Sequence, residues 1–133
     1  MTFLLGIDHV AITVADLEAS CAFYTRLFDG KVWRDFAPAG RPAVRVIDLG
    51  GARLSVHQAG NGVDLVADKP TVGSVDICFR WGGSIGEAVA HLKTHDLPII
   101  DGPSPRQTAD GRPAQSVYFR DLDRNLIELM AAD

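Results

Sequence analysis

The sequence predicts an α+β protein built from two successive βαβββ modules. Several stretches alternate apolar and polar residues, as strands with one buried face do. Two longer stretches combine a capping residue with apolar residues at helical spacing. The same order of elements occurs twice, with the strand-like stretch 7–13 lying 67 positions before 74–80. Because neither half has enough surface for a stable core alone, we expect a single domain over residues 1–133, with modules at roughly 5–60 and 72–131.

The first module begins with a strand at 6–14, "GIDHVAITV", in which valines and isoleucine alternate with more polar residues. Asp16 is placed to cap the following helix, and Gly30 is expected to end it. Three short strands follow, joined at the last step by the tight turn "LGGA"; they are predicted at 31–36, 43–49 and 53–58.

The second module repeats this order. Its first strand is predicted at 73–81, and its helix begins with a capping box formed by Ser84 and Glu87. The stretches "LPII", "QSVYFRD" and "NLIELM" are interpreted as its three remaining strands. The segments 59–72 and 102–113, rich in Gly, Pro, Asp and Thr, are predicted to be irregular connections, one linking the modules and the other a candidate flap.

Composition excludes several classes of function. The net charge of −4 and the pI near 5.4, without a basic cluster, argue against partners such as nucleic acid or anionic lipid. Apolar runs are far shorter than the roughly 20 residues that span a bilayer, and the N-terminus lacks the basic region of a signal peptide, so we expect no membrane association. With only two cysteines, Cys21 and Cys78, a disulfide-free cytoplasmic protein is expected.

Four side chains form the candidate site: His9, His57, Asp76 and Glu128. Strand alternation places each of them on the less hydrophobic face of its strand. The repeat relates the four residues in two pairs, because His9 and Asp76 lie in the first strands of their modules and His57 and Glu128 in the last. A pseudo-twofold axis would bring the four toward one centre, and imidazoles with carboxylates suit a divalent first-row metal.

Each of these residues also has a structural interpretation. A histidine in a strand is often a satisfied core or groove residue, and a lone acidic residue can bond to backbone or face solvent. The spacing alone therefore leaves a metal site and a site for a polar ligand open. Other residues of the same groove can contact anions or carbonyls or form surface ion pairs; these are Arg45, Arg53, Tyr118 and Arg120.

Two long stretches carry a family resemblance. "IDHVAITVADLEASCAFYTRLFDGKV" resembles the opening of the vicinal oxygen chelate superfamily, which includes glyoxalase I, extradiol dioxygenases and bleomycin-binding proteins, and "VYFRDLDRNLIEL" resembles its closing motif. With "LSVHQAG" and "VGSVDICF", the chain is most similar to small glyoxalase-domain proteins often called glyoxalase-domain-containing protein 5-like. The resemblance implies two βαβββ modules in an open, cupped barrel around a divalent metal, Zn, Ni, Mn or Fe(II), usually in a homodimer.

Residue by residue, the resemblance places metal ligands at His9, His57 and Glu128. Asp76 stands where the superfamily commonly has a further histidine, so it is interpreted as a fourth ligand or a base. The closing loop departs from the usual "DPDGN", with Leu122 and Arg124 in place of Pro and Gly. If residue 124 is left-handed, arginine costs roughly 1 kcal/mol relative to glycine.

Three hypotheses of function follow. The first is a metal-dependent, glyoxalase-like lyase or isomerase, similar to lactoylglutathione lyase. Its small oxygen-rich substrate would chelate the metal through vicinal oxygens. Glu128 and Asp76 would be the catalytic groups, and the substrate contacts would be Arg45, Tyr118 and Arg120. The second is an Fe(II) ring-cleaving dioxygenase. The third is a metal-free protein that sequesters a drug against Trp33, Phe36 and Trp81. Whether the site lies within one chain or across a swapped dimer is left open.

Overall fold

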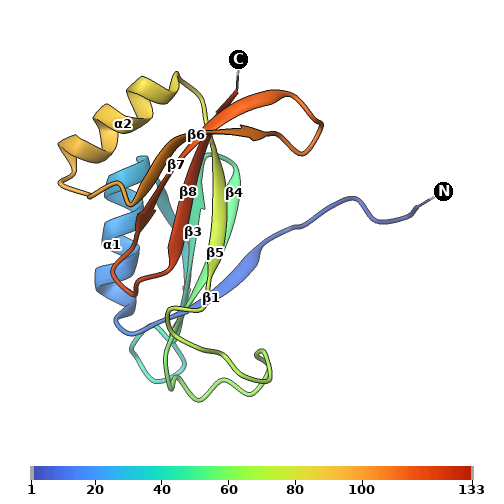
Figure 1. Cartoon of the computed structure of the whole chain (residues 1–133). Helices are drawn as coiled ribbons and strands as arrows, with labels where there is room; N and C mark the ends of the chain where they lie inside the picture. The colour runs from blue at the N-terminus through green and yellow to red at the C-terminus, as the bar shows by residue number, and fades with distance from the viewer. Residues whose placement is uncertain (1, 133) are drawn as a thin grey trace. The chain divides into compact units, whose positions relative to one another are not determined.

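The computed structural model describes residues 2–132 and divides the chain into two compact units, Met1–Gly73 and Ser74–Asp133. Each unit consists of a four-stranded mixed sheet and one helix, in the order βαβββ (Figure 1). The predicted α+β class and the repeated element order are thus confirmed. None of the described helices is long and apolar enough to cross a membrane.

Unit 1 has the strand order β1-β4-β3-β2. Strand β1 pairs with β4 in parallel, and the other pairs are antiparallel. Helix α1 packs on one face of this sheet, against β3, β4 and β2. The elements of unit 1 are β1 (Val10–Val14), α1 (Leu17–Phe28), β2 (Lys31–Phe36), β3 (Val44–Leu49) and β4 (Ala52–Gln58).

Local sequence explains where α1 begins and ends. Asp16 takes an extended conformation, and its side chain accepts a hydrogen bond from the backbone N–H of Ala19, as predicted for an N-cap. The predicted stop at Gly30 is one residue late, because Asp29 itself adopts the left-handed conformation with φ of 51°. An aspartate tolerates this region better than most residues, so it can end the helix without glycine.

The core of unit 1 lies between α1 and the sheet. Side chains from both layers are buried there, including Ile12, Val14, Leu17, Cys21, Tyr24, Leu27, Ile47, Leu49, Leu54 and Val56. The alternate strand positions point to the other side, which we call the distal face of unit 1. Its central residues are Thr13 of β1, Arg53, Ser55 and His57 of β4, and Val44, Val46 and Asp48 of β3.

Unit 2 has the corresponding strand order β5-β8-β7-β6, again with one parallel pair, β5 with β8. The predicted N-cap of α2 is confirmed, since Ser84 Oγ accepts a hydrogen bond from the backbone N–H of Glu87. Ala88 and Leu92 of α2 are buried, and the helix packs on β7 and β8. The elements of unit 2 are β5 (Asp76–Trp81), α2 (Ile85–Thr94), β6 (Asp101–Gln107), β7 (Pro113–Arg120) and β8 (Leu126–Ala132).

One strand of unit 2 lies where an irregular connection was predicted. The stretch "LPII" is not a strand, and β6 instead occupies Asp101–Gln107, paired with β7. Pro103 and Pro105 made this segment resemble a loop, but β6 is the edge strand of its sheet, where a missing N–H is tolerated. The segment 59–72, by contrast, contains neither helix nor strand, as predicted.

The closing loop between β7 and β8 is held by a buried carboxylate. Asp121 Oδ1 accepts hydrogen bonds from the backbone N–H groups of Asp123 and Asn125, and Asp121 Oδ2 accepts one from the Asn125 side chain. Asn125 Oδ1 in turn accepts the backbone N–H of Val75. The loop therefore ties the beginning of β8 to the residue that precedes β5.

Arg124 of this loop is left-handed, with φ of 71°, as its glycine-like position suggested. We expect Arg124→Gly to raise the free energy of unfolding by about 0.5–1 kcal/mol, because glycine adopts this conformation without steric cost. Urea denaturation followed by circular dichroism measures the change. Arg112→Gly is the matched control at a residue that the structure does not place in this region, and an equal or larger gain in the control would contradict the explanation.

Candidate functional site

His57 is the predicted site histidine of strand β4 in unit 1. It lies on β4 between Thr13 of β1 and Val44 of β3, and it is half-buried. Burial lowers the pKa of its imidazole, so the ring is neutral at pH 7. The ring borders a cavity of about 160 Å³ whose other wall comes from the segment 58–70. A neutral imidazole beside a small cavity can bind a metal or accept a proton.

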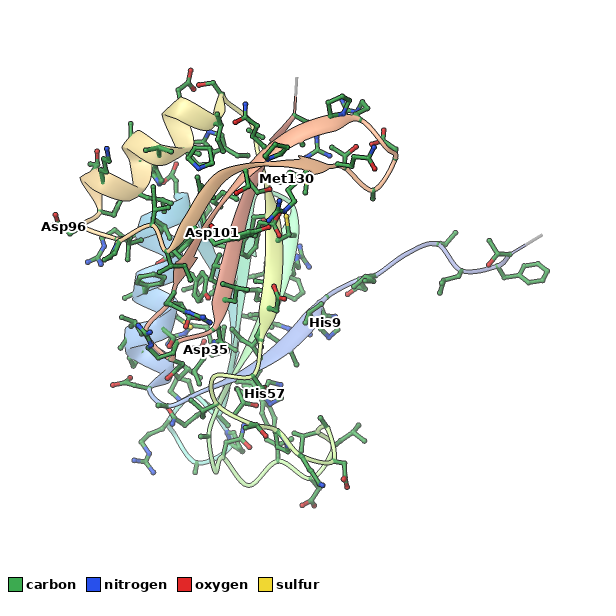
Figure 2. The ribbon with its side chains drawn as sticks, viewed as in Figure 1. His9, Asp35, His57, Asp96, Asp101 and Met130 are labelled. Atoms are coloured by element: carbon green, nitrogen blue, oxygen red, sulfur yellow. The ribbon has the colours of Figure 1, made fainter. Side chains whose placement is uncertain are left out.

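His9 lies at a different position along the same sheet. It directly precedes β1, its side chain is 54% exposed, and its Nδ1 is 2.8 Å from Asp8 Oδ1. The register pairs Thr13 with His57, which leaves His9 four residues, or about 13 Å, further along the strands. Figure 2 shows the two histidines separated in this way. The structure therefore does not bring the two imidazoles to one point, contrary to the predicted convergence.

Arg45 lies on the other side of the unit 1 sheet. Its guanidinium is 2.7 Å from Glu18 Oε2 of α1 and 2.7 Å from Asp35 Oδ1 of β2. Hydrogen bonds to Asp35 and then Glu18 raise the pKa of Arg45, and the same contact lowers the pKa of Asp35. Two carboxylates thus engage this arginine, and it joins α1 to the sheet rather than pointing to the face that holds His57.

Two of the aromatic residues proposed for drug binding, Trp33 and Trp81, lie in different units and have different neighbours. Trp33 lies beside a β-bulge in β2, and two guanidinium groups contact its ring, with Cζ of Arg53 at 4.0 Å and Cζ of Arg34 at 4.5 Å from the ring centroid. Trp81, however, packs on His91 of α2, with ring centroids 5.1 Å apart. Trp81 is therefore engaged by the helix of its own unit.

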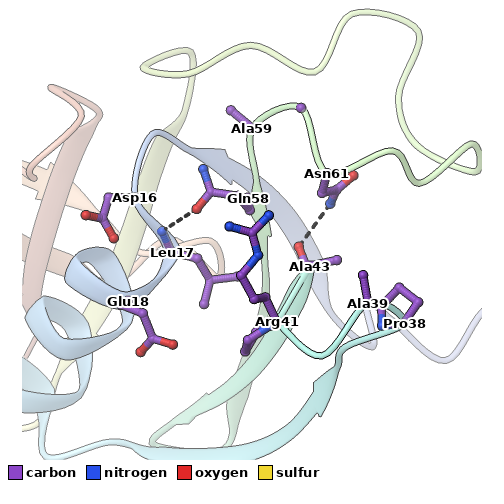
Figure 3. A pocket seen from close by; sticks show the side chains of 12 residues that line it. Asp16, Leu17, Glu18, Pro38, Ala39, Arg41, Ala43, Gln58, Ala59 and Asn61 are labelled. Carbon is purple, nitrogen blue, oxygen red and sulfur yellow. Dashed lines mark hydrogen bonds between the residues drawn. The ribbon is translucent and has the colours of Figure 1, made fainter.

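A cavity of about 480 Å³ lies at the N-terminus of α1 (Figure 3). Gln58 forms part of its wall, where its side chain accepts the backbone N–H of Leu17 and donates to the carbonyl of Ala15. Asn61 anchors the opposite wall by donating to the carbonyl of Ala43. None of the predicted site residues lines this cavity, and its amide side chains are used to hold the walls together.

In unit 2, four predicted residues share one face of the sheet. Glu128 of β8 pairs with Tyr118 of β7, and one step along the strands Leu126 pairs with both Asp76 and Arg120. Opposed residues of paired strands point to the same side, so Asp76, Tyr118, Arg120 and Glu128 all lie opposite α2. We call this the distal face of unit 2; it also contains Cys78 and Arg80 of β5, Ser116 of β7 and Met130 of β8, the last labelled in Figure 2.

Glu128 is the central ionisable group of this face. It is half-buried, and none of the ion pairs among residues 2–132 engages it. Its neighbour on β5 is Cys78. Burial, followed by the charge and hydrogen bonding of Glu128, raises the pKa of the Cys78 thiol to about 11. The thiol is therefore protonated at pH 7, and Cys78 supplies a weak hydrogen-bond donor beside the carboxylate rather than a reactive thiolate.

Arg106 is a site residue that the sequence did not predict. It comes from the edge strand β6, and its Nε donates a hydrogen bond of 2.8 Å to the phenol oxygen of Tyr118. Its Nη1 donates to the carbonyl of Pro105 at 2.7 Å. Recognising an edge strand in "SPRQ" and pairing it with "PAQSVYFR" would have placed Arg106 near Tyr118, but the two prolines concealed that strand.

Within either unit, the described residues form no group of three His, Cys, Asp or Glu side chains able to hold a metal. Each unit does offer donors of the right chemistry: unit 1 a neutral imidazole at His57, and unit 2 the carboxylate of Glu128. Imidazole nitrogen with carboxylate oxygen is a donor combination that divalent first-row metals accept. The chemistry of these donors therefore fits a divalent ion.

Comparison with known proteins gives a consistent result. Residues 6–129 match the model of the Glyoxalase/Bleomycin resistance protein/Dioxygenase superfamily. The glyoxalase domain-containing protein RDO1 of Mycosarcoma maydis is 39% identical over 93% of this chain, which spans 66% of that protein, just under two thirds of its length. Virulence protein STM3117 of Salmonella typhimurium is 30% identical over 92% of this chain and 81% of its own.

Solved structures share the whole fold. The crystal structure of STM3117 superposes with a TM-score of 0.86 and 27% identity, covering 99% of this chain and 100% of that one. The fosfomycin resistance protein FosX of Listeria monocytogenes, solved with Mn(II), has a TM-score of 0.65 and 19% identity over 98% of this chain and 93% of its own, a likeness of fold alone. With two βαβββ modules of four-stranded mixed sheets, the chain belongs to the Glyoxalase/Bleomycin resistance protein/Dioxygenase superfamily.

Proposed function

We propose that this protein is a metal-dependent enzyme of the glyoxalase type, a lyase or isomerase that acts on a small oxygen-rich substrate. The observation that carries the proposal is Glu128. It is a half-buried carboxylate at the centre of the distal face of unit 2, without an ion-pair partner among the described residues. A carboxylate in such a place is costly unless it serves a ligand or a reaction. Membership of the superfamily supports the same assignment.

The proposed metal ligands are Glu128 and one imidazole of unit 1, supplied by the same chain or by the second chain of a homodimer. His57 is supported by its neutral ring, and His9 by its place in the opening motif. The register of β1 and β4 separates His9 from His57 along the strands, so we propose only one of the two histidines as a ligand of any single ion. The presence of Mn(II) in FosX supports a divalent ion in this fold, and the identity of the ion is left to measurement.

The remaining polar residues have separate roles in the proposal. When bound, a divalent ion supplies Lewis-acid stabilisation of negative charge on two adjacent substrate oxygens. Glu128 or Asp76, which lie on the same face of unit 2, accepts the proton that leaves the substrate carbon and returns it to the product. Tyr118 and Arg120 of β7 orient the substrate by donating hydrogen bonds to its oxygens.

The test is metal retention after purification without chelator. We expect roughly one divalent ion per chain in the unaltered protein, measured by elemental mass spectrometry, and at least about a tenfold loss in Glu128→Gln, because an amide is a much weaker ligand than a carboxylate. Glu87→Gln, on the exposed first turn of α2, is the matched control and should retain the ion. His9→Ala and His57→Ala should differ, one losing the ion and the other keeping it.

Retention of no ion by the unaltered protein, or equal retention by Glu128→Gln and Glu87→Gln, would overturn the metal-dependent assignment. The reaction class is tested on the metal-loaded protein. Isomerisation of a 2-oxo hemithioacetal without oxygen uptake supports a glyoxalase-type reaction. Oxygen uptake with formation of a yellow product from catechols would instead assign the protein as a ring-cleaving dioxygenase.

A further inference from the structure

Arginine is concentrated around Glu128 although the chain as a whole is acidic, with a net charge of −4. Arg80 of β5 lies one step along the strands from Cys78, the neighbour of Glu128, and Arg120 of β7 lies one step from Tyr118. Arg106 of β6 reaches Tyr118 from the edge of the sheet. Three guanidinium groups therefore share the distal face of unit 2 with the carboxylates of Glu128, Asp76 and Asp101, and Arg106 is the one that contacts Tyr118.

Arg106 differs in its partners from two other arginines, Arg45 and Arg112. Arg45 is engaged by two carboxylates, and Arg112, at the turn of the same β6–β7 hairpin, contacts Asp110 with Nε 3.3 Å from Oδ2. In the described part of the chain no carboxylate forms an ion pair with Arg106. The carboxylates of Glu128 and Asp101 act on Arg106 from a distance without pairing with it, so N–H groups of its guanidinium remain available for a ligand.

The guanidinium of Arg106 is nevertheless held in place. Its Nε is bonded to the Tyr118 oxygen and its Nη1 to the carbonyl of Pro105, and Cζ lies 5.4 Å from the Tyr118 ring centroid. Guanidinium has five N–H donors in a fixed plane, so donors remain after these two bonds. Because the geometry is set before a ligand arrives, less conformational entropy is lost on binding.

We propose that Arg106 and Tyr118 form an oxyanion-binding subsite beside Glu128, which makes the substrate an anion that carries a carboxylate or phosphoryl group next to its reacting oxygens. The substrate class rests on the proposed function, whereas binding of the oxyanion itself does not. The phenol oxygen of Tyr118 accepts the Arg106 hydrogen bond, so its own hydroxyl hydrogen is donated to the ligand. Arg106 supplies the charge and the paired N–H groups that fit two oxygens of one anion.

Carboxylate and phosphoryl groups share this recognition chemistry, and the experiment distinguishes them. The full chain, stripped of metal with chelator, is labelled with ¹⁵N on arginine and titrated separately with inorganic phosphate and with glycolate. The Nε–H signal of Arg106, identified by its loss in Arg106→Gln, is expected to shift and saturate with at least one of the two probes. The probe that binds more tightly indicates whether the substrate carries a carboxylate or a phosphoryl group.

Variants distinguish anion binding by Arg106 itself from nonspecific electrostatic attraction of the anion to this hairpin. We expect Arg106→Gln to weaken the apparent affinity for the tighter probe by roughly tenfold or more, measured calorimetrically, because one charge-assisted pair is lost. Arg106→Lys should recover only part of the affinity, since an ammonium lacks the planar fork. Arg112→Gln is the matched control, with the same loss of charge on the same hairpin, and should stay within about twofold of the unaltered protein.

The proposal is overturned if neither probe shifts the Arg106 signal, or if Arg112→Gln weakens binding as much as Arg106→Gln. Its outcome is distinguishable from that of the metal assignment. Oxyanion binding that depends on Arg106 in a protein that retains no metal supports this subsite and rejects the metal-dependent reaction. Retention of the ion through Glu128 without Arg106-dependent binding supports the reaction and rejects the subsite.

Discussion

Replacing Asn125 with alanine is expected to lower the free energy of unfolding by about 3 kcal/mol. The Asn125 side chain is fully buried and makes two hydrogen bonds, accepting the Val75 N–H at 2.9 Å and donating to Asp121 Oδ2 at 2.9 Å. Alanine would leave both partners without the amide in a protein interior, and each buried group that loses its partner costs roughly 1–3 kcal/mol. The same bonds fix the beginning of β8, two residues before Glu128.

Asn61→Ala provides the matched control, because Asn61 also uses both ends of its amide, toward Ala43 and Val63, but is only half-buried. It should cost about 1 kcal/mol or less, since water replaces the lost bonds. Urea denaturation of both variants is followed by circular dichroism, which reports the helices and sheets of both units. A loss below about 1 kcal/mol in Asn125→Ala would show that the closing loop is not held as its hydrogen bonds indicate.

The parts of the fold that depend on local chemistry were predictable from sequence. The caps formed by Asp16 and Ser84 each require only a side-chain oxygen and a backbone N–H three residues on, and both are present. The left-handed conformation of Arg124 was suggested by the closing motif of the family, which has glycine at this position. Family resemblance then supplied the architecture that these local signals do not specify.

The sequence predicts on which face of a sheet each candidate site residue lies, but not how far along the strand it lies relative to residues of the neighbouring strands. Alternation correctly places Glu128, Asp76 and Tyr118 on one side of the unit 2 sheet. It also places His57 opposite the buried Leu54 and Val56. Alternation says nothing about which residue of a neighbouring strand lies alongside. That register is set by the whole sheet, which is why the separation of His9 from His57 appears only in the structure.

Arg106 could not be predicted because its strand breaks a compositional rule. Proline within a run argues against a strand, and β6 contains two prolines. The rule holds for central strands, where every N–H is used, and fails at the edge of a sheet. Once β6 was interpreted as a loop, nothing placed Arg106 beside Tyr118, although Tyr118 itself was predicted to be a substrate contact.

The edge strand β6 comes close to the backbone of β7 at Gly102, and this leads to the second large expected effect: Gly102→Ala should destabilise the protein by about 3 kcal/mol or more. Gly102 has φ of 90°, and an alanine Cβ there would overlap the carbonyl oxygen of Ser116 and lie 3.1 Å from the Cα of Val117. These are backbone atoms of β7, so they cannot move aside without separating the two strands. Left-handed backbone alone costs an alanine roughly 1–2 kcal/mol.

Comparing Gly102→Ala with Gly111→Ala isolates the steric part of this effect. Gly111 lies at the turn of the same hairpin with φ of 86°, yet a Cβ there would meet nothing within 4 Å. Its substitution should therefore cost only the conformational term, about 1 kcal/mol, in the same denaturation assay. Because Arg106 reaches Tyr118 only while β6 stays paired with β7, Gly102→Ala should also weaken oxyanion binding, whereas Gly111→Ala should leave it unchanged. Equal stability of the two variants would mean that β6 and β7 do not approach at Gly102 as closely as the structure indicates.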